Sequence, residues 1–143
     1  MERAITALFE RYARETRAAL AGAADEQAIA ALYDEAFIAA SPAGVRCGAN
    51  SDAFIRQLVD GFSHYRAIGT KAMTVESVKV DPIDALHALA RVAWRAIYDV
   101  RGDETAIDFS NVYLVRVDAR GARVFGWITG DEQAVLREHG VIA

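Results

Sequence analysis

Apolar side chains recur at helical spacing through the first twenty positions of the chain. The opposite face pairs charges of opposite sign four residues apart, such as Glu10 with Arg14, which stabilise an exposed helix surface. The pattern predicts an amphipathic helix that ends near Gly22. Its apolar stripe consists of Ile5, Leu8, Phe9, Tyr12, Thr16 and Leu20.

Two further helices are predicted before the pattern changes. Asp25 is placed to cap a second helix, which the Ser-Pro-Ala-Gly sequence at 41–44 would end. Its apolar face would comprise Ile29, Leu32, Tyr33, Ala36 and Phe37. A third helix begins at one of the polar residues Asn50, Ser51 or Asp52 and ends at Gly69. Its stripe is Phe54, Ile55, Leu58, Val59, Phe62 and Tyr65.

After the third helix the pattern becomes the alternation of β-strands. A first strand is predicted around 74–80, where β-branched residues are frequent. In the second strand Val92, Trp94, Ala96 and Tyr98 alternate with Arg91, Arg95 and Asp99. The charged turn at 101–104 leads to a third strand at 108–117, and the DARG turn at 118–121 joins it to a fourth at 123–129.

A last helix is predicted from about Asp131 to His139, with Gly140 as its end. This order of elements predicts one α+β domain over residues 1–143. Three N-terminal helices would pack on a curved, mostly antiparallel sheet, and a short C-terminal helix would follow it. Because a twisted sheet covered on one side curls around its helices, we expect a cone-shaped barrel with an internal pocket.

Charge and composition exclude several classes of partner. The net charge is −4, and the 16 Lys and Arg residues are spread along the chain, so we expect no nucleic-acid partner. The longest stretch without charges, residues 36–45, is too short to cross a bilayer. The N-terminal segment lacks the apolar core of a signal peptide, so we expect a cytoplasmic protein without a membrane partner.

No cysteine or histidine pattern indicates a metal site. Cys47 is the only cysteine, so the chain has no internal disulfide. We interpret it as a small buried or half-buried residue and not as a reactive thiol. His64, His87 and His139 lie far apart, without the spacing of a zinc site. We therefore expect neither a metal nor another cofactor.

Two long segments carry a family resemblance. ALYDEAFIAASPAGVRCGANSDAFIRQL, residues 31–58, resembles the opening of the SnoaL-like branch of the nuclear transport factor 2-like superfamily. VYLVRVDARGARVFGWITGDEQAVLREHG, residues 112–140, resembles the closing hairpin and helix of that branch. The resemblance implies a cone-shaped α+β barrel, a deep apolar pocket and a homodimer through the outer sheet face. Members include polyketide cyclases, ketosteroid isomerases, scytalone dehydratases and epoxide hydrolases, alongside non-catalytic binding modules, so the fold alone does not choose a function.

Strand parity predicts which residues face the pocket. On the second strand these are Ala88, Ala90, Val92, Trp94, Ala96 and Tyr98. If residue 117 lies opposite residue 123, then Asn111, Tyr113 and Val115 share a face with Phe125, Trp127, Thr129 and Asp131. A slip of one residue would present Ser110, Val112 and Leu114 instead. The first register is preferred because it gathers the aromatic side chains on one face and leaves Arg116 on the other.

The pocket face supplies the candidate ligand-binding residues. They are Tyr65, Trp94, Tyr98, Asn111, Tyr113 and Trp127, although ordinary core packing also accounts for such aromatic side chains. Asp131 resembles by position the general base of the SnoaL-like cyclases, and a carboxylate in an apolar pocket suits proton abstraction. Asp131 directly before the last helix is also an ordinary N-cap, and this interpretation is the favoured one. His64 would be its catalytic partner across the pocket, or a solvated residue in the last turn of its helix.

Three functions remain open at this point. The first is a domain that binds a small apolar, cyclic or aromatic molecule. The second is an isomerase, cyclase or dehydratase that works by proton transfer, with Asp131 as base. The third is a protein-interaction module that uses the outer sheet face. On that face Leu89, Ala93 and Ile97 interrupt a predicted charge ladder of Arg91, Arg95, Asp99 and Asp108, which suits either a homodimer contact or exposure to solvent.

Overall fold

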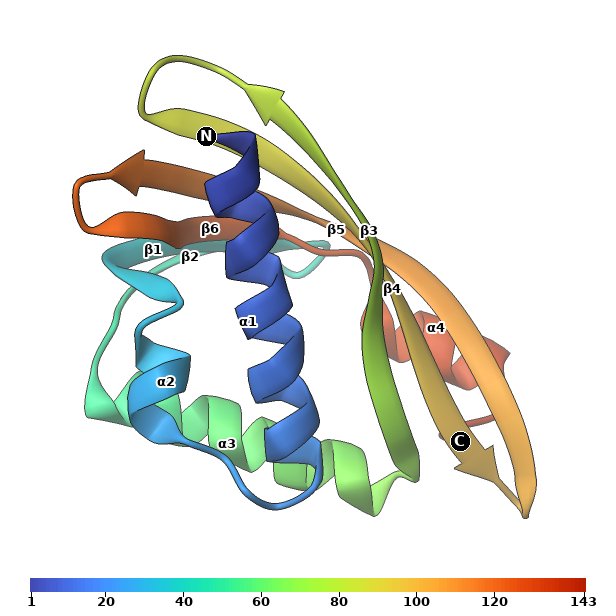
Figure 1. Cartoon of the computed structure of the whole chain (residues 1–143). Helices are drawn as coiled ribbons and strands as arrows, with labels where there is room; N and C mark the ends of the chain where they lie inside the picture. Colours follow the sequence, from blue (N-terminus) through green and yellow to red (C-terminus); the bar gives the residue numbers. More distant parts are fainter.

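The computed structural model describes all residues, 1–143, and has the expected α+β architecture (Figure 1). The helices are α1 (Glu2–Leu20), α2 (Glu26–Ala30), α3 (Asp52–Ala67) and α4 (Glu132–Glu138). The strands are β1 (Tyr33–Ser41), β2 (Gly44–Ala49), β3 (Thr70–Pro82), β4 (His87–Val100), β5 (Asp103–Asp118) and β6 (Gly121–Ile128). No helix has the length and apolar character needed to cross a membrane.

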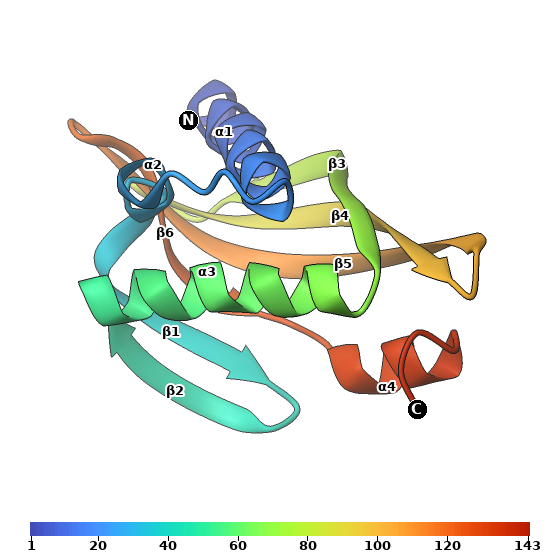
Figure 2. The ribbon, with the colours of Figure 1, turned by 90° about the horizontal axis from the view of Figure 1, so that it is seen from below.

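The six strands form one curved sheet in the order β2-β1-β6-β5-β4-β3. Neighbouring strands are antiparallel except β1 and β6, which are parallel. The sheet does not close, because β2 and β3 are its two edges. Helices α1 and α3 lie on the concave side, and α4 lies beyond the end of α3 (Figure 2). The expected cone shape is thus confirmed as an open, curved sheet around helices.

The two long helices form where the apolar stripes predicted them. On α1 the buried residues are Ile5, Leu8, Phe9, Thr16, Ala19 and Leu20. Ile5, Leu8 and Phe9 belong to the main core cluster with residues of the sheet. Ser51 caps α3, since its hydroxyl accepts a hydrogen bond from the Phe54 amide at 3.2 Å. Gly69 ends this helix segment with φ at +93°, and a Cβ there would lie 2.6 Å from the Asp99 carbonyl oxygen. Only glycine fits this entry into β3.

The predicted second helix is wrong beyond Ala30, because Tyr33 begins strand β1. Residues four apart share a face in a strand as well as in a helix, so Tyr33 and Phe37 fit both patterns. Tertiary contacts decide between them: Phe37 stacks on Trp127 of β6 with ring centroids 4.9 Å apart. The Asn50 side-chain amide also donates to the Tyr33 carbonyl at 3.2 Å, which fixes the start of the strand.

The sheet therefore has six strands instead of the four predicted. Ser41 pairs with Gly44 at the tip of a tight hairpin, so the predicted helix break at 41–44 is a β-turn between β1 and β2. This hairpin extends the sheet past β6 and provides one of its free edges.

The predicted parity of β4 is confirmed. All six residues assigned to its inner face are buried: Ala88, Ala90, Val92, Trp94, Ala96 and Tyr98. Tyr113 and Trp127 also face each other across β5 and β6, as predicted. The turn register is wrong by one residue, because Val117 pairs with Ala122 and not with Arg123. A bulge at Phe125 restores the register.

Phe125 is consequently not a pocket residue, contrary to the prediction. The pairing passes from Leu114 with Gly126 to Val115 with Val124, so Phe125 has no partner in the ladder. Its ring packs against His87 with centroids 5.8 Å apart. On either side of the bulge, Val124 and Ala122 belong to the main core cluster, and Trp127 packs against it.

A buried arginine ties β1 to the β5–β6 hairpin. The Arg123 guanidinium is bonded to the Asp118 carboxylate at 3.0 and 3.2 Å and to Asp34 at 3.3 Å. Hydrogen bonds from Arg123, from the Arg120 amide and from Arg116 hold the pKa of the Asp118 carboxyl well below its usual range. These contacts fix the hairpin that carries Trp127.

Candidate ligand pocket

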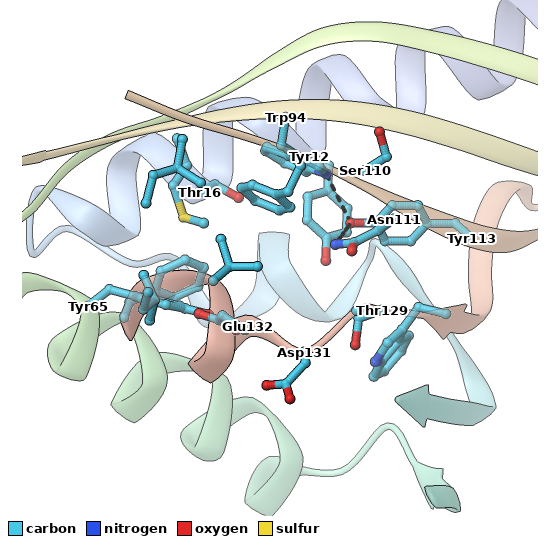
Figure 3. Close-up of a pocket in the computed structure, with 18 of the residues that line it drawn as sticks. Tyr12, Thr16, Tyr65, Trp94, Ser110, Asn111, Tyr113, Thr129, Asp131 and Glu132 are labelled. Atoms are coloured by element: carbon cyan, nitrogen blue, oxygen red, sulfur yellow. Dashed lines mark hydrogen bonds between the residues drawn. The ribbon is translucent and has the colours of Figure 1, made fainter. Parts of the chain in front are cut away.

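The concave side of the sheet encloses a cavity of about 300 Å³ (Figure 3). Tyr12 of α1, Tyr65 of α3, Trp94 of β4 and Tyr113 of β5 contribute to its wall, and the start of α4 lies at its rim. Fourteen of its 21 lining residues are hydrophobic, so the cavity is an apolar space with few polar groups. The pocket expected from the sheet curvature is therefore present.

Every tyrosine and every tryptophan of the chain lines this cavity. The chain has five tyrosines and two tryptophans, and they are Tyr12, Tyr33, Tyr65, Tyr98, Tyr113, Trp94 and Trp127. Their rings pack edge to face or stacked: Tyr12 lies 5.8 Å from Trp94 and 5.7 Å from Tyr113, measured between centroids. The aromatic side chains thus provide flat walls and also carry most of the hydroxyl groups.

Three of these side chains, Tyr12, Tyr33 and Tyr113, form what we call the tyrosine cluster. The Tyr12 and Tyr33 hydroxyls are hydrogen-bonded at 2.8 Å. The Tyr113 hydroxyl accepts from Trp94 Nε1 at 3.2 Å and from Asn111 Nδ2 at 3.4 Å (Figure 3). Two N–H donors therefore converge on one phenolic oxygen, whose own proton must be donated elsewhere.

The Tyr113 hydroxyl keeps a proton of its own to donate. A phenol hydroxyl carries one proton and can also accept, and both hydrogen bonds of the Tyr113 oxygen are accepted ones. Burial raises the pKa of Tyr12, Tyr33 and Tyr113, so all three keep their protons at neutral pH. The Tyr113 proton is thus available to an acceptor oxygen of a molecule in the cavity.

All six predicted ligand-binding residues line the cavity. Tyr65, Trp94, Tyr98, Asn111, Tyr113 and Trp127 come together there from four different elements. The structure also adds pocket residues that the sequence did not single out as binding groups. They are chiefly Tyr12, Thr16, Tyr33, Ser110, Thr129 and Glu132. Tyr12 and Thr16 could have been found, because they are the hydroxyl-bearing members of the first apolar stripe.

His64 does not join the pocket. It is exposed on α3 and is absent from the cavity lining, whereas its neighbour Tyr65 lines it. The predicted pairing of His64 with Asp131 across the pocket is therefore wrong. The imidazole instead lies beside the Tyr65 ring, with centroids 6.4 Å apart.

Asp131 caps the last helix at the cavity rim. Its Oδ1 accepts a hydrogen bond from the Ala134 amide at 3.0 Å, and the residue is exposed. Asp131 also belongs to the lining of the cavity. The capping interpretation is confirmed, while a role as general base stays a prediction. His139 ends the same helix, with its Nδ1 at 2.9 Å from the Val135 carbonyl oxygen.

Away from the cavity, the outer sheet face carries part of the predicted charge ladder. Arg95 forms a bidentate pair with Asp108 of β5, at 2.7 and 3.1 Å. The Arg95 guanidinium lowers the pKa of the Asp108 carboxyl. No group of three or more His, Cys, Asp and Glu side chains is arranged to hold a metal ion.

Solved structures share this fold at low sequence identity. An NTF2-like protein with a cystatin-like fold from Novosphingobium aromaticivorans superposes with a TM-score of 0.70 at 19% identity, covering 94% of this chain and 88% of that one. An NTF-2 like protein of unknown function from Shewanella oneidensis gives 0.65 at 12% identity, covering 91% and 98%. A ketosteroid isomerase-like protein from Erwinia carotovora atroseptica gives 0.57 at 18% identity, covering 91% and 92%. These likenesses concern the fold alone.

The sequence itself matches a family model over almost its whole length. No curated protein matches the chain. The family model described as NTF2-like protein (DUF6841) matches residues 2–132, from the first helix to the start of the last. This match spans every strand of the sheet and the helices α1, α2 and α3. The chain belongs to this NTF2-like family.

Proposed function

We propose that the protein binds a small, largely apolar molecule with a cyclic or aromatic ring, whose acceptor oxygen lies against the tyrosine cluster. The observation that carries the proposal is the convergence of Trp94 Nε1 and Asn111 Nδ2 on the Tyr113 hydroxyl. That hydroxyl is held in one orientation and has a proton to donate. A carbonyl or ether oxygen in the cavity would accept it.

The size and lining of the cavity support a ligand of this kind. Its volume of about 300 Å³ lies at the lower end of the ~300–1,000 Å³ of small-molecule sites. The walls are aromatic rings and aliphatic side chains, which favour a ring system over a flexible polar molecule. Trp94 and Trp127 do not fill the space, which argues against the interpretation as an interaction module with a packed interior.

The enzyme alternative receives less support. Proton transfer by Asp131 would need a second polar side chain beside it, and the hydrogen bond it makes is to the backbone amide of Ala134. With His64 outside the cavity, no acid–base pair forms from the two predicted catalytic residues. Binding without catalysis is therefore the function we put forward.

Tryptophan fluorescence tests the proposal directly, because both tryptophans line the cavity. The probes are adamantanone and methyleneadamantane, two rigid cages of nearly equal shape, of which only the ketone carries an acceptor oxygen. We expect saturable binding of both, with the ketone tighter by about tenfold, the worth of one hydrogen bond. Tyr113→Phe should remove most of this difference. Absence of saturable binding by either probe to the wild type would overturn the proposal.

A further inference from the structure

The cavity has carboxylates at its rim but no basic side chain anywhere in its lining. Asp131 and Glu132 are adjacent at the start of α4, and both line the space. None of the 21 lining residues is Lys, Arg or His. Neither carboxylate takes part in any ion pair of the structure. Their charge is therefore not neutralised by the protein.

Glu132 is exposed, but it lies in the cavity lining beside tyrosine hydroxyls. Burial is the largest cause that raises the pKa of Tyr65 and of Tyr98, two tyrosines of the lining. The negative charge of the Glu132 carboxylate is the second largest cause for both. Figure 3 shows Tyr65 and Glu132 close together, on the opposite side of the cavity from Asn111 and Tyr113. The polar groups thus form two ends: donor hydroxyls at the tyrosine cluster and acceptor carboxylates at the rim.

Tyr98 brings a further hydroxyl to this acidic end of the cavity. The residue lines the cavity and lies beside the Thr70 hydroxyl. A phenol hydroxyl can both donate and accept, so Tyr98 can also meet a polar group of a bound molecule.

The aromatic walls favour the same kind of charge. Tyr65, Phe62 and Trp127 lie in the lining together with the two carboxylates. The faces of such rings are negative and attract cations. Carboxylates without a counter-ion and aromatic faces together create a negative potential that excludes acidic ligands.

We propose that the ligand carries a protonated amine, which is bound between Glu132, Asp131 and the aromatic rings while the rest of the molecule fills the apolar cavity. This inference rests on the proposed binding function and specifies the chemical class of the ligand. A cyclic amine with an oxygen acceptor at its far end would use both polar ends of the cavity.

Three adamantane derivatives of the same shape test the inference: adamantyl methylamine, adamantyl methanol and adamantane carboxylate. At neutral pH they are cationic, neutral and anionic. Fluorescence titrations at low ionic strength should give the amine at least about tenfold tighter binding than the carboxylate, with the alcohol between them. The preference should weaken as salt is added, since screening reduces the attraction at a partly exposed carboxylate.

Glu132→Gln should remove most of the advantage of the amine over the alcohol. The matched control is Glu138→Gln, which makes the same change of charge on the same helix outside the lining and should leave that advantage intact.

The outcomes separate this inference from the proposed function. Binding of the alcohol without any preference for the amine would overturn the inference while the binding function stands. Tightest binding of the carboxylate, or an equal loss of the amine's advantage in both variants, would also overturn it. If the three derivatives and adamantanone all fail to bind, the binding function itself fails.

Discussion

The indole nitrogen of Trp94 donates a hydrogen bond to the Tyr113 hydroxyl at 3.2 Å, between the neighbouring strands β4 and β5. Both side chains are about 4% exposed, so the bond is largely shielded from bulk water. The bond fixes the Tyr113 hydroxyl at the inner end of the cavity. The proposed recognition by the tyrosine cluster and the stability of the sheet therefore depend on the same pair.

Tyr113→Phe should destabilise the protein by about 1–3 kcal/mol, because the buried Trp94 N–H loses its acceptor. Trp94→Phe should also destabilise it, through lost packing and an altered cluster. Urea unfolding of the two single variants and the double variant measures their coupling. The double variant should cost less than the sum of the singles, since the second change removes a group that the first had left unpaired. Strict additivity would mean that the bond contributes nothing.

The tyrosines should resist ionisation in the folded protein. Burial is the largest cause that raises the pKa of all five, whereas an unfolded chain ionises near pH ~10. Folding stabilises their neutral forms, so this contribution is complete below pH ~10 and is lost as the pH rises above it. Ultraviolet absorbance of phenolate should therefore develop only with alkaline unfolding. A phenolate signal near pH ~10 in the native protein would contradict the buried cluster.

Asp131 should contribute to stability as a helix cap. Asp131→Ala should cost about 1 kcal/mol, because the Ala134 amide loses its acceptor, whereas Asp131→Asn keeps a competent cap and should cost much less. Thermal unfolding of the two variants distinguishes them. Equal losses would show that the charge, and not the cap, is what the fold needs from this residue.

A homodimer through the outer sheet face stays a prediction. That face exposes large apolar side chains near the β1–β2 hairpin: Ile38 at 43%, Val45 at 69% and Ile128 at 51%. Exposed apolar side chains on one sheet face suit a symmetric contact. Sedimentation should give a dimer for the wild type and a monomer for Ile128→Lys, with Ile83→Lys at the distant β3–β4 turn as a control. A monomeric wild type would refute the prediction.

The sequence predicted those elements whose apolar residues fit only one spacing, either that of a helix or that of a strand. The stripes of α1 and α3 and the alternation of β4 have a single interpretation, and the structure bears them out. Tyr33 and Phe37 were misassigned because a spacing of four fits both a helix and a strand, and only contact with Trp127 decides between them. The bulge at Phe125 depends on the partner strand, so the pattern of one strand cannot reveal it.

The candidate site was predictable as a list of residues but not as a network. Strand parity alone brought Trp94, Tyr98, Tyr113 and Trp127 to one surface. Tyr12 and Tyr33 reach the same place from a helix and from an edge hairpin, and their meeting depends on tertiary packing between distant segments. His64 was misplaced because an angle of 100° between neighbouring helical residues turns Tyr65 inward and His64 outward.

The most direct test of the binding function is a nuclear magnetic resonance titration that follows the two indole N–H signals. Only Trp94 and Trp127 give such signals, and both line the cavity. With adamantanone we predict that both shift along saturable curves with one dissociation constant, and that the Trp94 signal reports the change at the Tyr113 hydroxyl. Unmoved indole signals at saturating probe, or shifts confined to amides of the outer sheet face, would contradict binding in this cavity.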